Sequence, residues 1–261
     1  MDYQVLIPTH HKTLEECLKL AKKLNISTNS LISNQNGDDK IFKDDLVKVV
    51  DTNTIGVSKN RNNLLKYCEG DICICIDDDC PLVDNYREII KNEFKIFPEA
   101  EFILFNGIVT HENNRLVHNK KSKMVRRFRD ISYGGGPGLV FKRSALEKYN
   151  LSYNEEIGYP NKIQLGEDTL FLKSLVDQKV KIARSKETLF IIEDDVDNSI
   201  YFKGVTEDFV YSRGYVTKML HPNLWRLYII KYSFFLKKWR GNKFSFCKLH
   251  KLLKQGAKDS K

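Results

Sequence analysis

The sequence predicts an α/β fold: a mostly parallel, Rossmann-like central sheet flanked by helices, followed by a C-terminal basic amphipathic helical segment. Short apolar runs alternate with single stretches of helical periodicity, which is typical of parallel sheets with right-handed crossovers. A length of 261 residues with 41% hydrophobic content is enough to bury a large core. Residues 218–261 contain 12 of the 43 basic residues but only one of the 34 acidic residues. A nearly neutral body therefore carries a strongly basic tail. We therefore predict a first domain over residues 1–220 and a basic helical segment over residues 221–261.

The first half of the chain alternates between strand and helix signals. Thr13 and Glu16 have the spacing of a capping box at the start of the first helix, and Ser58 can cap the second helix, which Gly70 ends. We expect strands at residues 3–8, 30–33, 46–50 and 72–76, and helices at residues 14–24 and 59–68.

The second half continues this pattern. We expect a helix at residues 85–97, strands at residues 101–109 and 139–141, and a helix that opens at Glu167 and Asp168. In open sheets of this kind, ligands bind beyond the carboxyl ends of the strands. Thr9, Asn34, Asp51 and the aspartates of residues 77–79 are all expected at such ends. The sequence thus predicts that residues far apart in the chain share one crevice.

Composition limits the class of protein. The start "MDYQVLIPTHHK" lacks the basic and long apolar regions of a secretory signal, and no window of 18 apolar residues predicts a membrane span. The six cysteines stand mainly in apolar contexts, which favours buried free thiols over metal ligands or disulfides. We expect a cytoplasmic, globular protein.

The stretch "DICICIDDDC" (residues 71–80) ends an apolar strand in three carboxylates. Because side chains alternate along a strand, Asp77 and Asp79 should share a face, roughly 6–7 Å apart, while Asp78 points away. Charges gathered so closely repel unless a cation lies between them, and Mg²⁺ or Mn²⁺ binds carboxylate oxygens together with substrate phosphates. The alternative is a solvated acidic turn, which the buried strand leading into the triplet disfavours.

Three further motifs have candidate roles, each with a plainer alternative. In "GEDTLFL" (residues 166–172), the helix dipole would keep Glu167 or Asp168 ionised as a general base; capping of the first turn is the alternative. In "GVSKNRNNLL" (residues 56–65), Arg61 either reaches a phosphate from the first turn of a helix or is a surface arginine. In "GGGPGLVFKRSAL" (residues 134–146), four glycines permit close backbone approach to a bound molecule.

Taken in order, these motifs resemble the family 2 glycosyltransferases of GT-A fold, over roughly residues 2–220. The resemblance rests on "VLIPTH", "GVSKNRNNLLKYCEGDICICIDDD", "GGPGLVFKRSAL" and "GEDTLFL". It extends to the bacterial members that build capsule, exopolysaccharide or O-antigen units, because "YFKGVTEDFVYSRG" (residues 201–214) matches a segment of that subgroup. The resemblance implies inverting transfer of a hexose from a nucleotide sugar, usually a UDP-sugar, to a saccharide acceptor, with Mn²⁺ or Mg²⁺ as cofactor.

The resemblance also implies a role for each matching residue. Asp77 would contact the ribose or the cation, Asp79 would be the principal metal ligand, and Asp78 would lie nearby on the nucleotide sugar. Other nucleotide-sugar contacts would come from Pro8, Thr9, Asn34 and Arg61. Asp168 matches the catalytic base, with Glu167 beside it at the acceptor. The loop that contains Gly135 and Gly136 would border the acceptor sugar.

Two positions depart from the family's pattern. Many members have "DDGS" after the second strand, where this chain has "SNQNGDD" (residues 33–39), so Asn34, Gln35 or Asp38 would bind the uracil instead. Many also supply a histidine ligand after the last strand, where this chain has "FIIEDDVDNS" (residues 190–199). Glu193, Asp194 or Asp195 would replace that histidine as the third metal ligand.

The basic tail contains a two-faced helix candidate, "NLWRLYIIKYSFFLKKWR" (residues 223–240). At helical spacing its apolar face holds Trp225, Tyr228, Ile229, Tyr232, Phe235, Leu236 and Trp239, and its basic side holds Arg226, Lys231, Lys237, Lys238 and Arg240. This pattern is typical of a helix in a membrane interface, and the alternative is a helix packed on the catalytic domain. Since lipid-linked acceptors reside in membranes, we predict a peripheral protein on the inner face of the cell membrane, with an anionic membrane surface and a lipid-linked saccharide as partners.

Two alternative functions are less consistent with the sequence than a glycosyltransferase. A nucleotidyltransferase acting on sugar phosphates would need a glycine-rich, basic loop after the first strand, and "PTHHKTLEE" contains no glycine. A basic protein that binds membranes or nucleic acid would explain the tail. However, the body is nearly neutral and shows no RNA- or DNA-binding motif, so no nucleic-acid partner is expected.

Overall fold

The computed structural model describes residues 2–109, 115–117, 120–131, 136–192, 205–239 and 241–260. The chain forms two compact units. The first comprises Met1–Ile55, Lys59–Tyr153 and Phe171–Asp194, and the second comprises Gly56–Ser58, Asn154–Leu170 and Asp195–Lys261. The predicted domain boundary at residue 220 stays a prediction. Within the described residues, no helix is long and apolar enough to cross a membrane.

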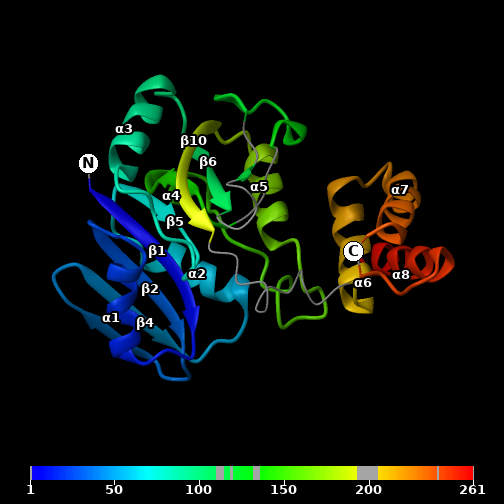
Figure 1. Ribbon diagram of the computed structural model, residues 1–261, viewed down its shortest axis with the longest axis horizontal. Helices are drawn as coiled ribbons and strands as arrows, with labels where there is room; N and C mark the ends of the chain where they lie inside the picture. The colour runs from blue at the N-terminus through cyan, green and yellow to red at the C-terminus, as the bar shows by residue number, and fades with distance from the viewer. Residues whose placement is uncertain are drawn as a thin grey trace. The chain divides into compact units, whose positions relative to one another are not determined.

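The first unit is built on one sheet, whose strands follow the order β3-β4-β2-β1-β5-β9-β6-β10-β8, with β7 paired to β6. Figure 1 shows several of these strands side by side. Their bounds are β1 Tyr3–His10, β2 Asn29–Gln35, β3 Lys40–Lys43, β4 Val47–Thr52, β5 Ile72–Cys75, β6 Phe102–Val109, β7 Arg115–Val117, β8 Lys123–Met124, β9 Leu139–Lys142 and β10 Ile182–Ile192.

Strand direction divides the sheet. β4, β2, β1 and β5 run parallel, as predicted, and β10 runs parallel to β6. Between these two parallel groups, β9 pairs antiparallel with both β5 and β6. The sheet is therefore mixed, and the parallel prediction describes its N-terminal half. The edge strands β3 and β8 were not predicted; β3 is exposed along its whole length and has no buried face to reveal it.

Two hydrophobic clusters lie on the two faces of the sheet. α1 (Leu14–Lys23) and α3 (Tyr86–Ile96) contribute to the cluster that contains Val5 and Ile7. α2 (Val57–Tyr67), α4 (Ser144–Tyr149) and α5 (Glu167–Asp177) contribute to the cluster that contains Leu6. Since successive strand residues point to opposite faces, one strand supplies both clusters. The sheet is covered on both sides, which leaves the strand ends as the place for a site.

Local capping signals were only partly correct. The capping box of Thr13 and Glu16 is confirmed, with both reciprocal hydrogen bonds present. The cap predicted for Ser58 is wrong: α2 begins at Val57, two residues before the predicted start, so Ser58 lies inside the helix, and its hydroxyl donates to the Ile157 carbonyl at 2.5 Å. A tertiary partner has replaced the local one.

The second unit contains α6 (Glu207–Leu220), α7 (Trp225–Lys237) and α8 (Phe246–Asp259). α6 and α8 approach to backbone contact, because a Cβ on Gly214 would collide with Leu253 and one on Gly256 would collide with Tyr211. The buried core of this helical group is Val205, Phe209, Val210, Ile229, Leu236, Leu249, Leu253 and Ala257.

The apolar face predicted for residues 223–240 packs inside this helical group. Ile229 and Leu236 are fully buried, with Trp225, Tyr232 and Trp239 partly buried beside them. The assignment of Phe235 to this face is wrong, since 53% of the residue is exposed. On the basic side, Arg226, Lys231, Lys237 and Lys238 are exposed as predicted, and Arg240 lies outside the described residues.

Candidate active site

Asp77 and Asp79 converge beyond the carboxyl end of β5. One oxygen of each and the Cys80 sulfur all lie within 4.8 Å of one another. The strand ends at Cys75, so this convergence comes from a turn and not from strand alternation. The Cys80 amide donates to the Asp77 carbonyl at 3.1 Å and closes that turn. The prediction that Asp77 and Asp79 lie together is confirmed, but the predicted cause, alternation along a strand, is wrong because β5 ends before them.

Cys80 serves this cluster as a hydrogen-bond donor. Its side chain is buried, and burial, followed by the charges of Asp77 and Asp79, raises the pKa of the thiol far above its usual range. The thiol lies 3.3 Å from Asp79 Oδ1 and donates to it. The two carboxylates supply the oxygen donors of the cluster. Hard oxygen donors of this kind fit Mg²⁺ or Mn²⁺.

Asp78 has separate partners on β1 and in the residues that follow it. Its Oδ2 accepts a hydrogen bond from Thr9 Oγ1 at 2.5 Å and forms an ion pair with Lys12 Nζ at 3.3 Å. Thr9 is buried, so this contact holds Asp78 on the β1 side of the turn. Lys12 was missed by the sequence reasoning, although a basic residue directly after a strand end was available as a signal.

Asn34 is fully buried and bonded on both ends of its amide. Its Nδ2 donates to Asp51 Oδ1 at 2.6 Å and to the Lys12 carbonyl at 2.8 Å, while its Oδ1 accepts from the Lys12 amide at 3.2 Å. Thr9, Asn34 and Asp51 are neighbours in register across β1, β2 and β4. Asn34 therefore positions Asp51, whose place at the strand end was predicted but to which no role was assigned.

The other uracil candidates lie further out. Gln35 donates to Thr54 Oγ1 at 3.3 Å, and Asp38 forms an exposed ion pair with Lys40 at 3.1 Å. Neither contact tests the predicted role.

Arg61 connects α2 to the aspartate turn. Its side chain is only 11% exposed, its Nη2 lies 3.6 Å from Asp77 Oδ1, and its guanidinium carbon stands 5.6 Å from the centre of the Tyr153 ring. On another side it meets Gly136, where a Cβ would lie 2.8 Å from the guanidinium carbon. A surface arginine is thus excluded: the guanidinium is held beside the candidate metal ligands.

Pro8 lines the same small pocket as Arg61, Asp77 and Gly136. A buried hydrogen bond from Asn60 Nδ2 to the Thr9 carbonyl, 2.8 Å long, ties α2 to the end of β1. The structure therefore brings Pro8, Thr9, Arg61, Gly136 and the three aspartates together in the first unit. Gly135, Glu193, Asp194 and Asp195 lie outside the described residues.

Glu167 and Asp168 open α5, as predicted, and belong to the second unit. Gly166, just before them, has φ +103, and a Cβ there would lie 2.5 Å from Val216 Cγ2, so a larger residue would be strained and would displace the valine. The Leu170 amide donates to the Gly166 carbonyl at 2.9 Å and forms the first turn of the helix. Partial positive charge at such a terminus stabilises an ionised carboxylate.

No protein-family model matches the chain, and no curated protein sequence matches it. Solved structures of S. aureus TarS do match. TarS 1-349 is 16% identical, with a TM-score of 0.57 over 98% of this chain and 70% of that chain. TarS 1-349 in complex with UDP-GlcNAc is 16% identical, with a TM-score of 0.59 over 97% and 70%. A longer TarS structure is covered to 43%. The chain has the GT-A fold. The fold class predicted from the sequence is thereby confirmed.

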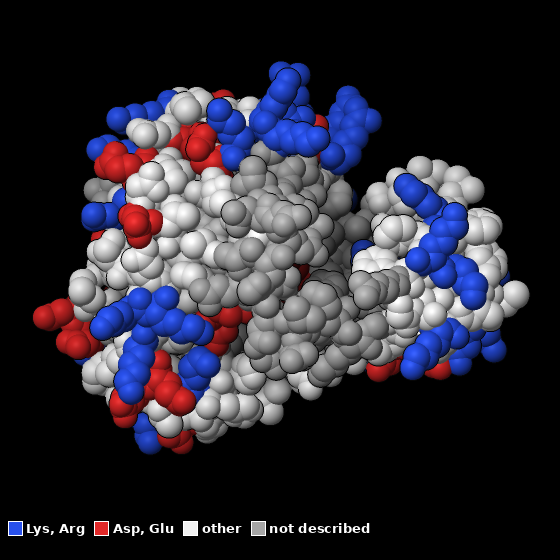
Figure 2. Space-filling model, in the orientation of Figure 1, with Lys and Arg blue, Asp and Glu red and all other residues white. Residues whose placement is uncertain are grey.

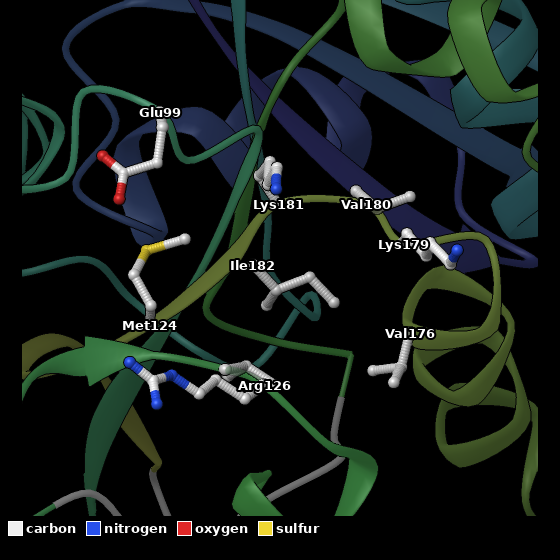
Figure 3. Close-up of a pocket in the computed structure, with 9 residues that line it drawn as sticks. Glu99, Met124, Arg126, Val176, Lys179, Val180, Lys181 and Ile182 are labelled. Atoms are coloured by element: carbon white, nitrogen blue, oxygen red, sulfur yellow. The ribbon is translucent and has the colours of Figure 1, made fainter.

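The GT-A sheet carries another cavity at its opposite edge. This cavity, of about 450 Å³, lies where β6 and β10 begin, and Figure 3 shows its lining. Arg126, Lys179 and Lys181 face it together with one carboxylate, that of Glu99. It offers no carboxylate pair among its lining residues, so the aspartate turn is the better candidate for a metal-assisted reaction.

Proposed function

We propose that this chain is a metal-dependent, inverting glycosyltransferase that moves a hexose from a UDP-sugar to a saccharide acceptor. The observation that carries the proposal is the convergence of Asp77 and Asp79 beside the held guanidinium of Arg61. In α/β sheets, the strand ends where these groups lie are the usual place for a nucleotide. The similarity to TarS, of which one structure is in complex with UDP-GlcNAc and another with UDP, supports a UDP-sugar as donor.

Asp79, with Asp77, would hold Mn²⁺ or Mg²⁺. When bound, such an ion neutralises negative charge on the diphosphate that leaves. The chain's own cations would act on the same group: Arg61 next to Asp77, and Lys12 next to Asp78. Thr9 and Asp78 hold each other through their hydrogen bond, so they would present a fixed edge to the ribose.

Asp168 would act as the general base. It would take the proton of the attacking acceptor hydroxyl, whose oxygen forms a bond to the anomeric carbon as the bond from that carbon to the diphosphate oxygen breaks. The electron pair of the broken bond leaves with the nucleotide, and attack from the opposite face inverts the anomeric centre. Glu167 and the loop with Gly135 and Gly136 would position the acceptor sugar.

The biological setting of the proposal rests on the sequence resemblance. A lipid-linked acceptor, a role in capsule or other bacterial surface polysaccharide synthesis, and peripheral attachment to the inner face of the membrane all follow from the subgroup motif and the basic tail. The predicted tail helix buries much of its predicted apolar face within the helical group. Attachment would therefore need another surface, which is considered below.

The test is release of UDP from UDP-sugars in the presence of Mn²⁺ and saccharide acceptors. Asp168→Asn should lower the turnover by about 10²–10⁴, the usual contribution of a general base, while UDP still raises the melting temperature. Asp177→Asn, at the other end of α5 and in an exposed ion pair with Lys173, is the matched control. Unchanged turnover in Asp168→Asn would refute its role as base. Failure of UDP, with or without Mn²⁺, to shift the melting temperature of the parent would refute the function itself.

A further inference from the structure

α7 exposes an apolar stripe on the side opposite its buried face. Leu227, Ile230 and Phe234 stand at helical spacing i, i+3 and i+7, and they are 65%, 44% and 58% exposed. Leu224, just before the helix, is exposed as well. Large contiguous apolar patches on a protein surface, rimmed by polar residues, mark sites of interaction with a partner or a membrane.

A groove of about 450 Å³ runs beside this stripe, between α7 and α8. Ile230 belongs to both, so the stripe continues into the groove. An aromatic row marks the same path: the Phe234 and Phe246 rings are 4.7 Å apart, and Phe246 stacks on His250, which lines the groove. The volume falls within the range of about 300–1,000 Å³ that is usual for ligand pockets.

The rim of the groove is cationic. Arg226 enters it from α7, and Lys254 and Lys258 enter it from α8. Across the parts of the chain that the structure describes, no carboxylate lies within ion-pair distance of these three cations. Asp259, the nearest acid in sequence to Lys258, instead accepts from Tyr211 at 2.6 Å and pairs with Lys162 at 3.7 Å. A bound anion would therefore meet three cations that no described carboxylate neutralises.

His250 supplies a further polar atom to the groove. Its Nδ1 lies 3.3 Å from Ser233 Oγ, whose own hydrogen is donated to the Ile229 carbonyl at 2.8 Å. This contact suits the His250 tautomer in which Nδ1 is the donor to the serine oxygen. Nε2 bonds to no described residue and can serve a ligand.

We propose that this groove binds the phosphate of an anionic phospholipid while the stripe Leu224, Leu227, Ile230 and Phe234 contacts the acyl region of the bilayer. An apolar surface edged by cations that pair with no described carboxylate complements a lipid that is anionic at its headgroup and apolar below it. Figure 2 shows Lys and Arg side chains gathered over α7 and α8. The inference rests on the proposed peripheral attachment and is independent of the transfer chemistry.

Flotation of the full chain with vesicles tests the proposal. The parent should float with phosphatidylcholine vesicles that contain phosphatidylglycerol and should not float with phosphatidylcholine alone. Each lysine near an anionic surface changes the partition coefficient by about fivefold. Lys254→Gln/Lys258→Gln should therefore partition roughly 25-fold more weakly. Lys120→Gln/Lys121→Gln removes the same charge from exposed positions in the first unit and should stay within about twofold of the parent.

Two further measurements separate the possible outcomes. Leu227→Ser/Phe234→Ser should also lose flotation with an unchanged circular dichroism spectrum, since both side chains are exposed. Dihexanoyl phosphatidylglycerol below its micellar concentration should bind saturably to the parent and not to Lys254→Gln/Lys258→Gln, whereas inorganic phosphate alone should compete poorly. Equal flotation of the groove and control variants, or binding of RNA in place of vesicles, would overturn the proposal. UDP binding by all variants is expected to match the parent, while failure of the parent itself to bind UDP would count against the proposed function and not against the groove.

Discussion

Substituting Gly136 by alanine tests whether Arg61 acts from the position that the structure gives it. The added Cβ would lie 2.8 Å from the Arg61 guanidinium carbon and closer still to Nη2. Real Cβ atoms do not approach so closely, so the guanidinium must move. It is otherwise held by Asp77, at 3.6 Å, and by the Tyr153 ring, at 5.6 Å. The substitution therefore displaces one side chain without removing it.

The expected effect falls on donor use more than on folding. The moving atoms are the far end of a flexible side chain, so a strained rotamer should cost about 1 kcal/mol of stability. A hydrogen bond from a charged group contributes about 1.5–3 kcal/mol. If Arg61 makes one to the diphosphate, kcat/KM for the UDP-sugar should fall by about 10- to 150-fold.

A double-mutant cycle with Arg61→Ala decides the matter. If Gly136→Ala acts through Arg61, it should have no further effect on kcat/KM once Arg61 is alanine. UDP release at varied donor concentration and thermal melting are the two assays. Parent-like kinetics in Gly136→Ala, or losses that simply add in the double variant, would show that the reasoning about Arg61 is wrong.

Three other predictions follow from the same structure. Asp79→Ala should raise the Mn²⁺ concentration needed for half-maximal turnover by tenfold or more, while Asp78→Ala, whose carboxylate stands outside the cluster, should leave that concentration within about threefold of the parent; equal shifts would contradict the assignment. Burial raises the pKa of Glu93 and leaves its Oε2 without a partner, so its protonated form is favoured in the folded state. Stability from this group is full below the unfolded pKa of about 4.3 and is lost as pH rises through the folded pKa, so Glu93→Gln should be more stable than the parent in urea at pH 7 and lose that advantage at pH 4. Gly256→Ala places a Cβ against the α6 backbone and should cost about 3 kcal/mol or more, whereas the exposed neighbour Gln255→Ala should cost less than about 0.5 kcal/mol in the same urea titration.

Much of the framework was readable from local signals. The strands β1, β2, β4, β5 and β6 were predicted within a few residues, as were α1 and α3, because each repeats an apolar period that only one kind of element satisfies. The capping box of α1 involves two residues three positions apart, so nothing distant could alter it. The aspartate pair was also predicted from a local signal, because it follows closely after the buried strand β5.

Contacts across long sequence separations decided the rest. The antiparallel insertion of β9 depends on pairing Leu139–Lys142 with both β5 and β6, and a four-residue apolar run is the same read in either direction. Arg61 and Gly136 stand far apart in sequence, so their contact leaves no local periodic trace. Lys12 and Asp78 likewise meet because β1 and β5 are neighbours in the sheet.

α7 shows most clearly which features follow from the sequence and which from tertiary packing. The sequence by itself predicted a helix within residues 223–240 that is both apolar and basic, because composition and a period of 3.6 residues suffice for that, and α7 (Trp225–Lys237) is that helix. Which apolar side chains face outward was decided by the packing of α7 against α6 and α8, where the core selected Ile229 and Leu236 and left Leu227, Ile230 and Phe234 exposed. Hydrophobic burial depends on the area that neighbouring elements cover, and that area exists only once the chain has folded.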